Sequence, residues 1–101
     1  MDISNIYIMA KEYKDDHNIS FTAIVTVNKD LPDALSFFVP LKAGKDEDYV
    51  RVAVSMLKDR SLLSDAEEPC FVHSLLQYCI LHDIYCLVEK RLDCNKGDLI
   101  A

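Results

Sequence analysis

Two Cys-x-x-His pairs in one apolar segment are the residues of this chain whose types and spacing come closest to a chemical site. Cys70 stands before His73, and Cys79 stands before His82. Thiolates and imidazoles are ligands that zinc prefers, and a structural zinc ion needs four of them around it. If the segment is one helix, each residue turns the side chain by about 100°, so the second pair points away from the first. The spacing therefore predicts no shared metal site and no cofactor.

A smaller metal or thiol site is an alternative interpretation. Cys70 and His73 share the polar face of the expected helix near its start, where Cys94 or His17 could complete a set of ligands. Nothing nearby shows the closely paired cysteine spacing that makes a zinc motif specific. A metal- or thiol-dependent protein built around Cys70 and His73 is therefore kept as an alternative to a protein without such a site.

Cys70 could also act as a nucleophile, because a thiol at a helix N-terminus beside an imidazole has a lowered pKa. Glu67 and Glu68 lie close to it in the sequence, however, and their negative charges raise the pKa of a nearby thiol. No Gly-rich turn accompanies Cys70 to stabilise an oxyanion. We therefore expect no catalytic residue, a partly exposed structural Cys70, and a Cys79 that packs in the core as a small apolar side chain.

The composition excludes several classes of function. The formal net charge is −6, so the chain lacks the basic surface that binds nucleic acids and anionic membranes. Gly44 and Gly97 stand alone, and neither belongs to a phosphate-binding loop of the Gly-x-Gly-x-x-Gly or Walker type. We expect no direct binding to nucleic acid, no membrane binding and no nucleotide-dependent catalysis.

The N-terminal sequence bears on the cellular compartment. Residues 1–5 carry no basic stretch, and no uninterrupted apolar run is long enough for a signal peptide or a membrane span. We therefore expect a cytoplasmic protein, in which the four cysteines stay reduced.

Strands are predicted for the first half of the chain. Apolar and polar residues alternate over residues 6–13, 19–28 and 35–41, which is the pattern of strands with one buried face. Polar residues that favour turns separate these segments, so the three strands should form an antiparallel meander. Pro40 cannot donate a hydrogen bond to a neighbouring strand, which places it at a strand end or on an edge strand.

A helix is predicted to follow over about residues 47–60. The acidic run at 46–48 suits the positive end of the helix dipole, and the apolar residues after it fall on one broad arc. The rival interpretation of residues 49–57 is a strand, because valines alternate there with other residues. Length and the acidic start favour the helix.

A second helix is expected over residues 70–82, and a last strand over 84–90. Two signals compete for the start of this helix: a capping box that begins at Ser64, and Pro69, which suits a first helical turn. The apolar arc of the helix should consist of Phe71, Val72, Leu75, Leu76, Tyr78, Cys79 and Ile80.

These elements predict an α+β fold of the order β-β-β-α-α-β. An antiparallel sheet, made of the three-strand meander plus the C-terminal strand, should have both helices packed on one face. No repeat or linker divides the chain, so residues 1–101 are expected to form a single domain. Residues 93–101 are expected to be a loosely ordered tail.

Acidic residues carry the functional prediction. They form three clusters in segments that precede or connect the expected elements: Asp15 and Asp16; Asp46, Glu47 and Asp48; and Asp65, Glu67 and Glu68. If connecting segments gather at one end of the domain, converging carboxylates steer a basic partner and speed its capture. The sequence therefore predicts a non-catalytic protein-binding protein, an inhibitor or an immunity- or anti-defence-type neutraliser of a partner with a basic surface, for example a nucleic-acid-binding one.

Other interpretations stay open. Acids also favour helix starts for local reasons, so the clusters could be plain solvated surface. Tyr7 and Tyr13 fall on the face of the first strand opposite Ile6 and Ile8, where exposed tyrosines suit a protein interface. The chain could also be a self-associating structural module, in which an exposed sheet edge pairs with a second copy to form a homodimer.

Overall fold

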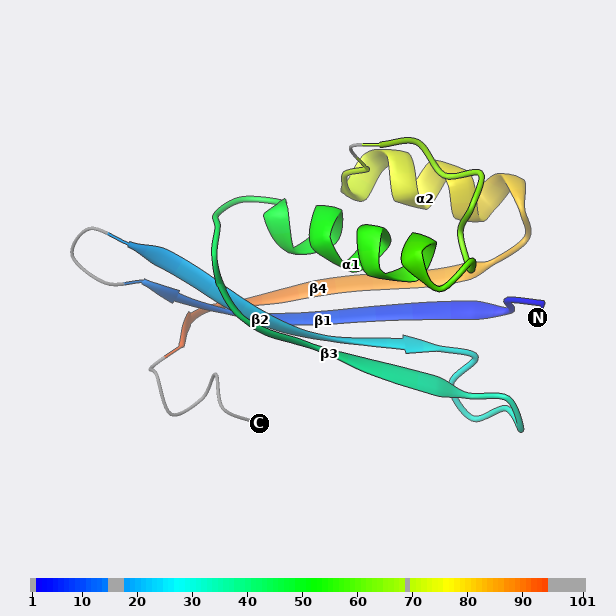
Figure 1. Ribbon diagram of the computed structural model, residues 1–101, viewed down its shortest axis with the longest axis horizontal. Helices are drawn as coiled ribbons and strands as arrows, with labels where there is room; N and C mark the ends of the chain where they lie inside the picture. Colours follow the sequence, from blue (N-terminus) through cyan, green and yellow to red (C-terminus); the bar gives the residue numbers. More distant parts are fainter. Residues whose placement is uncertain (1, 15–17, 69, 95–101) are drawn as a thin grey trace.

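The computed structural model describes residues 2–14, 18–68 and 70–94 of the chain. The elements follow one another as β1 (Asn5–Lys14), β2 (Ile19–Val27), β3 (Leu35–Ala43), α1 (Asp48–Asp59), α2 (Val72–Leu81) and β4 (Tyr85–Cys94). The predicted α+β class and element order are confirmed (Figure 1). Residues 49–57 belong to α1, so the rival strand interpretation of them is wrong.

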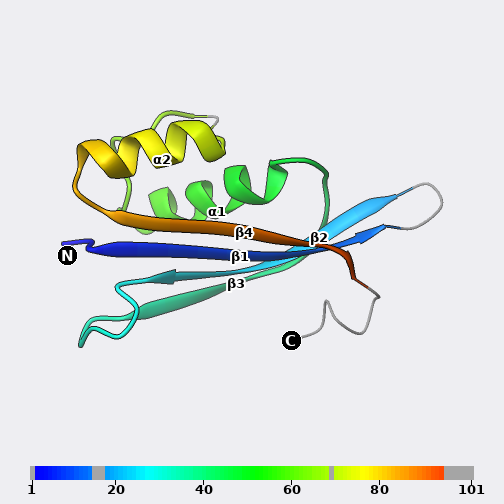
Figure 2. The ribbon, with the colours of Figure 1, turned by 180° about the vertical axis from the view of Figure 1, so that it is seen from behind.

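The strands form one mixed sheet in the order β3-β2-β1-β4. β2 pairs antiparallel with β1 and with β3, as the meander predicts, whereas β4 pairs parallel with β1. The prediction of an antiparallel sheet is therefore wrong for the last strand. The cause is the course of the chain: α1 and α2 run in the same direction across the sheet, so the strand after α2 enters with the polarity of β1 (Figures 1 and 2).

Both helices lie on one face of the sheet, and no helix of the described residues covers the other face (Figures 1 and 2). Ile6 and Ile8 of β1 and Val25 and Val27 of β2 point to the covered side and are fully buried. α1 packs on β1 and β2 and adds its own buried stripe of Val50, Ala53, Val54 and Leu57. Each such large apolar side chain contributes about 1.5–3 kcal/mol on burial, so the covered side holds the core.

The start of α2 lies later than either sequence signal predicts. The helix begins at Val72 after an extended Phe71, and Pro69 lies outside the described residues. The N–H of Phe71 donates to the Ser74 hydroxyl (2.9 Å), and the N–H of Val72 donates to the Glu47 carboxylate (2.7 Å). Because a helix leaves its first N–H groups without intrahelical partners, these acceptors stabilise the start of α2.

The burial of α2 differs from its predicted apolar arc. Leu75 and Cys79 are buried, but Leu76 and Ile80 are exposed. α2 packs on β4, which is the outermost strand on that side of the sheet. A helix above an edge strand finds a core only on the flank that faces the rest of the domain, so the apolar residues on its other flank remain in solvent.

β4 is longer than predicted. It runs from Tyr85 to Cys94 and stays in register with β1 up to a shift between the pairs Lys11–Arg91 and Tyr13–Cys94. The predicted tail of residues 93–101 therefore begins too early, because β1 is long enough to continue the ladder. Residues 95–101 lie outside the described part of the chain.

Asn28 ties the N-terminal segment to the end of β2. It is fully buried, its side-chain oxygen accepts the N–H of Ser4 (2.6 Å), and its amide donates to the carbonyl of Asp2 (2.9 Å). The carbonyl of Ser4 in turn accepts the N–H of Tyr85 at the start of β4 (3.1 Å). Asn28 therefore helps to place the first residue of β4 beside β1.

Replacing Asn28 by alanine should lower the free energy of unfolding by about 3 kcal/mol. The change removes two hydrogen bonds of about 1 kcal/mol each and puts alanine in the left-handed region, which costs about 1 kcal/mol more. Urea denaturation followed by circular dichroism measures the loss. Asn28→Gly is the matched control, because glycine tolerates the φ of 56° at this position, so its loss should be smaller. Equal losses in the two variants would contradict the conformational part of this explanation.

Candidate functional site: the open face of the sheet

The cysteines and histidines of the two Cys-x-x-His pairs do not form a common site. Cys70 and Cys79 are both buried, with 2% and 1% of their surfaces exposed, whereas His73 and His82 are exposed. The expectation of a partly exposed Cys70 on the polar face of the helix is wrong, because Cys70 precedes α2 and helical periodicity does not apply to it. Among the described residues, no three His, Cys, Asp or Glu side chains gather in a way that could hold a metal ion.

Two thiols meet between α2 and β4. The Cys79 thiol, buried as predicted, donates a hydrogen bond to Cys86, which together with burial raises the pKa of Cys79 above its ordinary value. The same hydrogen bond stabilises the thiolate of Cys86 and lowers the pKa of that residue, although burial opposes the effect. Cys86 is half-buried, so this contact makes one inert thiol and one more reactive thiol.

In a Cys94→Ser variant, Cys86 should react with Ellman's reagent before Cys70 and Cys79. The thiolate is the reactive species, so the rate at Cys86 should reach half its maximum at a pH below the ordinary cysteine pKa. Stopped-flow absorbance on the folded protein measures both the order and the pH dependence. Cys86→Ser in the same background should remove the fast phase, and a fast phase that persists in that variant would contradict this assignment.

The two described acidic clusters lie at different places along the helices. Asp46, Glu47 and Asp48 lie at the start of α1, and the hydrogen bond from Val72 to Glu47 places Glu47 beside the start of α2. In the segment between the helices, Glu68 lies 3.9 Å from Lys58 near the end of α1, and Asp65 lies near Tyr78 in the second half of α2. Asp15 and Asp16 lie outside the described residues.

Several of these carboxylates have partners within the fold. Glu47 caps α2, and Asp48 accepts the N–H of Lys45 (3.0 Å) and lies 3.7 Å from Arg51. Glu68 lies 3.9 Å from the ammonium of Lys58. Glu47, Asp48 and Glu68 therefore stabilise the fold through these contacts.

Asp46, Asp65 and Glu67 differ from the other carboxylates of the two clusters. All three are exposed, and their side chains form no hydrogen bond or ion pair with the described part of the chain. Burial first and then the negative charge of Asp65 raise the pKa of nearby Tyr78. These three carboxylates are the ones that present charge to solvent.

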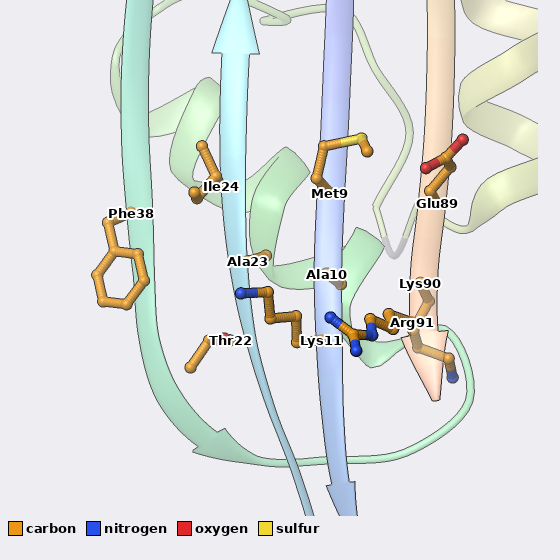
Figure 3. A pocket seen from close by; sticks show the side chains of 10 residues that line it. All are labelled: Met9, Ala10, Lys11, Thr22, Ala23, Ile24, Phe38, Glu89, Lys90 and Arg91. Atoms are coloured by element: carbon orange, nitrogen blue, oxygen red, sulfur yellow. The ribbon is translucent and has the colours of Figure 1, made fainter. Parts of the chain in front are cut away.

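The face of the sheet opposite the helices carries an apolar row that the sequence analysis missed. Met9 on β1 lies opposite Ile24 on β2, which lies opposite Phe38 on β3. Their side chains project from the same side of the sheet (Figure 3), and they are 40%, 41% and 49% exposed. The available signal was the presence of large apolar residues at positions that the strand alternation assigns to solvent.

The row lines a shallow hollow of about 490 Å³. Thr22 and Lys11 border it next to Ile24 and Met9, and Glu89 and Arg91 of β4 close one side (Figure 3). The hollow therefore combines an apolar floor with hydroxyl and charged groups at its rim.

Aromatic residues extend the same face beyond the hollow. Tyr7 follows the predicted alternation and lies on this side of β1. Its ring contacts that of Tyr85 on β4 at a centroid distance of 5.8 Å, and the Lys29 ammonium lies 5.0 Å from the centre of the Tyr7 ring. The open face thus presents apolar and aromatic side chains over β1, β2, β3 and β4.

Comparison of the chain with protein-family models, with curated proteins and with solved structures found no match. Within the described residues, none of the helices has the length and apolar character needed to cross a membrane.

Proposed function

We propose that this protein is a non-catalytic protein-binding protein that holds an apolar segment of its partner on the open face of the sheet. The observation that carries the proposal is the row of Met9, Ile24 and Phe38, which is exposed across three adjacent strands. Soluble monomers rarely expose large contiguous apolar patches, and such patches commonly mark binding surfaces.

The shape and charge of the face favour a protein segment as the occupant. The hollow is open and shallow, so it suits side chains that project from a partner's surface. Lys11 borders the apolar row on one side, and its ammonium favours a carboxylate beside the apolar side chains of the bound segment. Thr26 and Ser36 offer hydroxyl groups next to the row, where their side-chain oxygens lie 3.2 Å apart.

A second candidate surface consists of the exposed carboxylates Asp46, Asp65 and Glu67. The net charge of −6 adds to their field. This arrangement supports the narrower proposal of a cytoplasmic inhibitor, or an immunity- or anti-defence-type neutraliser, that captures a partner with a basic surface.

Replacing Ile24 and Phe38 by serine in one variant should weaken binding of the partner at least about tenfold, because truncating central apolar contacts of an interface costs more than about 1 kcal/mol each. The partner is captured on the immobilised protein from lysate of the host cells, identified by mass spectrometry, purified, and titrated by calorimetry against wild type and variant.

The matched control is Leu31→Ser, which removes a similarly exposed apolar side chain in the turn before β3. It should leave the affinity unchanged. A purified partner that binds the Ile24 and Phe38 double variant as tightly as wild type would refute the assignment of the open face.

Changing Asp46, Asp65 and Glu67 to lysine should slow the association of a basic partner about tenfold at low salt. Glu47 and Asp48 stay unchanged because they hold the helix starts. Stopped-flow measurements should show the difference between wild type and variant shrinking as salt shortens the screening length. Association rates that depend neither on salt nor on these substitutions would exclude these carboxylates as the capture surface.

A further inference from the structure

We propose that Cys79 and Cys86 form a reversible disulfide when the protein meets a peroxide, and that this bond ties α2 to β4. This inference goes beyond the proposed function, because the two thiols lie on the helix side of the sheet, away from the open face. Three features carry it: the two side chains face each other, a tight turn holds them in place, and the two thiols differ in their access to solvent.

The side chains of Cys79 and Cys86 meet in the layer between α2 and β4. Cys79 is 1% exposed on a helix that packs on β4. Tyr85 contacts Tyr7 on the open face, and successive residues of a strand point to opposite faces, so Cys86 points toward the helices. Cys86 packs there against the buried core to which Cys79 belongs. The hydrogen bond between the thiols therefore joins side chains that the two elements direct at each other.

The turn between α2 and β4 fixes the relative position of these two residues. The N–H of Ile84 donates to the carbonyl of Cys79 (2.8 Å), and the N–H of Asp83 donates to that of Ile80 (3.3 Å). With Asp83 in the left-handed region at a φ of 56°, these two bonds form the Schellman motif that commonly ends a helix. Cys79 is thus anchored by its own carbonyl next to the start of β4, and the two sulfurs are held together before any bond forms.

The two thiols have different roles because they differ in exposure. Cys86 is half-buried, so a molecule as small as hydrogen peroxide can reach its sulfur, whereas Cys79 is enclosed. The hydrogen bond from Cys79 lowers the pKa of Cys86, and the thiolate is the form that reacts with peroxides. Cys86 is therefore the residue that meets the oxidant, and Cys79 is the residue that closes the disulfide.

The reaction consumes one peroxide and releases two molecules of water. The Cys86 thiolate attacks a peroxide oxygen: a sulfur–oxygen bond forms, the oxygen–oxygen bond breaks, and the departing hydroxide takes up a proton. This step oxidises the Cys86 sulfur to a sulfenic acid by two electrons and reduces the peroxide. The Cys79 thiol then gives up its proton, its sulfur attacks the Cys86 sulfur, and the sulfenic hydroxyl leaves with that proton as water. A dithiol restores both thiols by exchange through a mixed disulfide and is itself oxidised.

Cys70 is placed less well to take part. It precedes α2, where its sulfur accepts the Ser74 hydroxyl (3.5 Å) and donates to the carbonyl of Phe71 (3.9 Å). It is also buried, so a peroxide cannot reach it as it reaches Cys86. The structure therefore favours Cys86 over Cys70 as the partner of Cys79.

The disulfide would strengthen the attachment of α2. Leu75 and Cys79 are the buried residues of this helix, so its apolar contact with the fold is small. A bond between Cys79 and Cys86 closes residues 79–86 into a loop and restricts the unfolded chain. The oxidised protein should therefore unfold at a temperature at least about 5 °C higher than the reduced protein.

Peroxide treatment of the folded Cys94→Ser variant, which keeps three of the four cysteines, tests the site. Alkylation in urea followed by intact mass spectrometry counts the remaining thiols, and chymotrypsin cuts after Leu81 and Tyr85 to separate the peptides of Cys79 and Cys86. We expect one alkylated cysteine after oxidation, a disulfide that joins those two peptides, and full recovery of the thiols in dithiothreitol. Calorimetry of the oxidised and reduced forms measures the change of unfolding temperature.

Three further variants in the same background separate the roles of the cysteines. Cys79→Ser should stop at the sulfenic acid of Cys86, which dimedone labels. Cys86→Ser should lose its thiols to peroxide at least about tenfold more slowly, because the reactive thiolate is gone. Cys70→Ala is the matched control and should form the disulfide as the parent does.

Four results would each overturn the proposal: thiols that all survive the peroxide, a disulfide that includes Cys70, a disulfide that forms only in urea, or an oxidised protein no more stable than the reduced one. None of these results depends on the binding of a partner to Met9, Ile24 and Phe38.

Discussion

Two helices can cover only one face of a four-stranded sheet, and this limit shapes the rest of the molecule. α1 lies over β1 and β2 and completes the core there. α2 is left with the outermost strand, β4, so only one of its flanks is buried. The opposite face of the sheet receives no helix from the described residues (Figures 1 and 2). The exposed apolar side chains on that face and on α2 follow from this division.

A few polar contacts fix how the two helices and the last strand sit on the sheet. Glu47 at the start of α1 accepts the first free N–H of α2, so the two helices start at the same end. Asn28 and Ser4 then hold the beginning of β4 beside β1. These contacts hold the start of β4 at the position where its parallel ladder with β1 begins. The acids of the first helix therefore serve the fold as well as any long-range capture of a partner.

The local pattern of the sequence accounts for the helices and strands and for the residues that are buried on the helix-covered face of the sheet. The alternation along β1 and β2 correctly predicts Ile6, Ile8, Val25 and Val27 as core residues, because strand periodicity depends on neighbouring residues alone. The same alternation places Met9 on the solvent side without indicating that Ile24 and Phe38 join it in a row. That row exists only because the strand registers align three residues that are far apart in the chain.

The sequence by itself determined the class of fold, the order of the elements and the burial of Cys79, and it limited Pro40 to a strand end or an edge strand. These properties follow from periodicity, helix-start preferences and the missing N–H of Pro40, all of which act over a few residues. Tertiary structure alone decided the parallel entry of β4, the burial of Cys70 and the exposure of Ile80. Each of these outcomes depends on which distant segments of the chain pack against each other. An apolar residue contributes the same periodicity to the sequence whether or not another layer of the fold covers it.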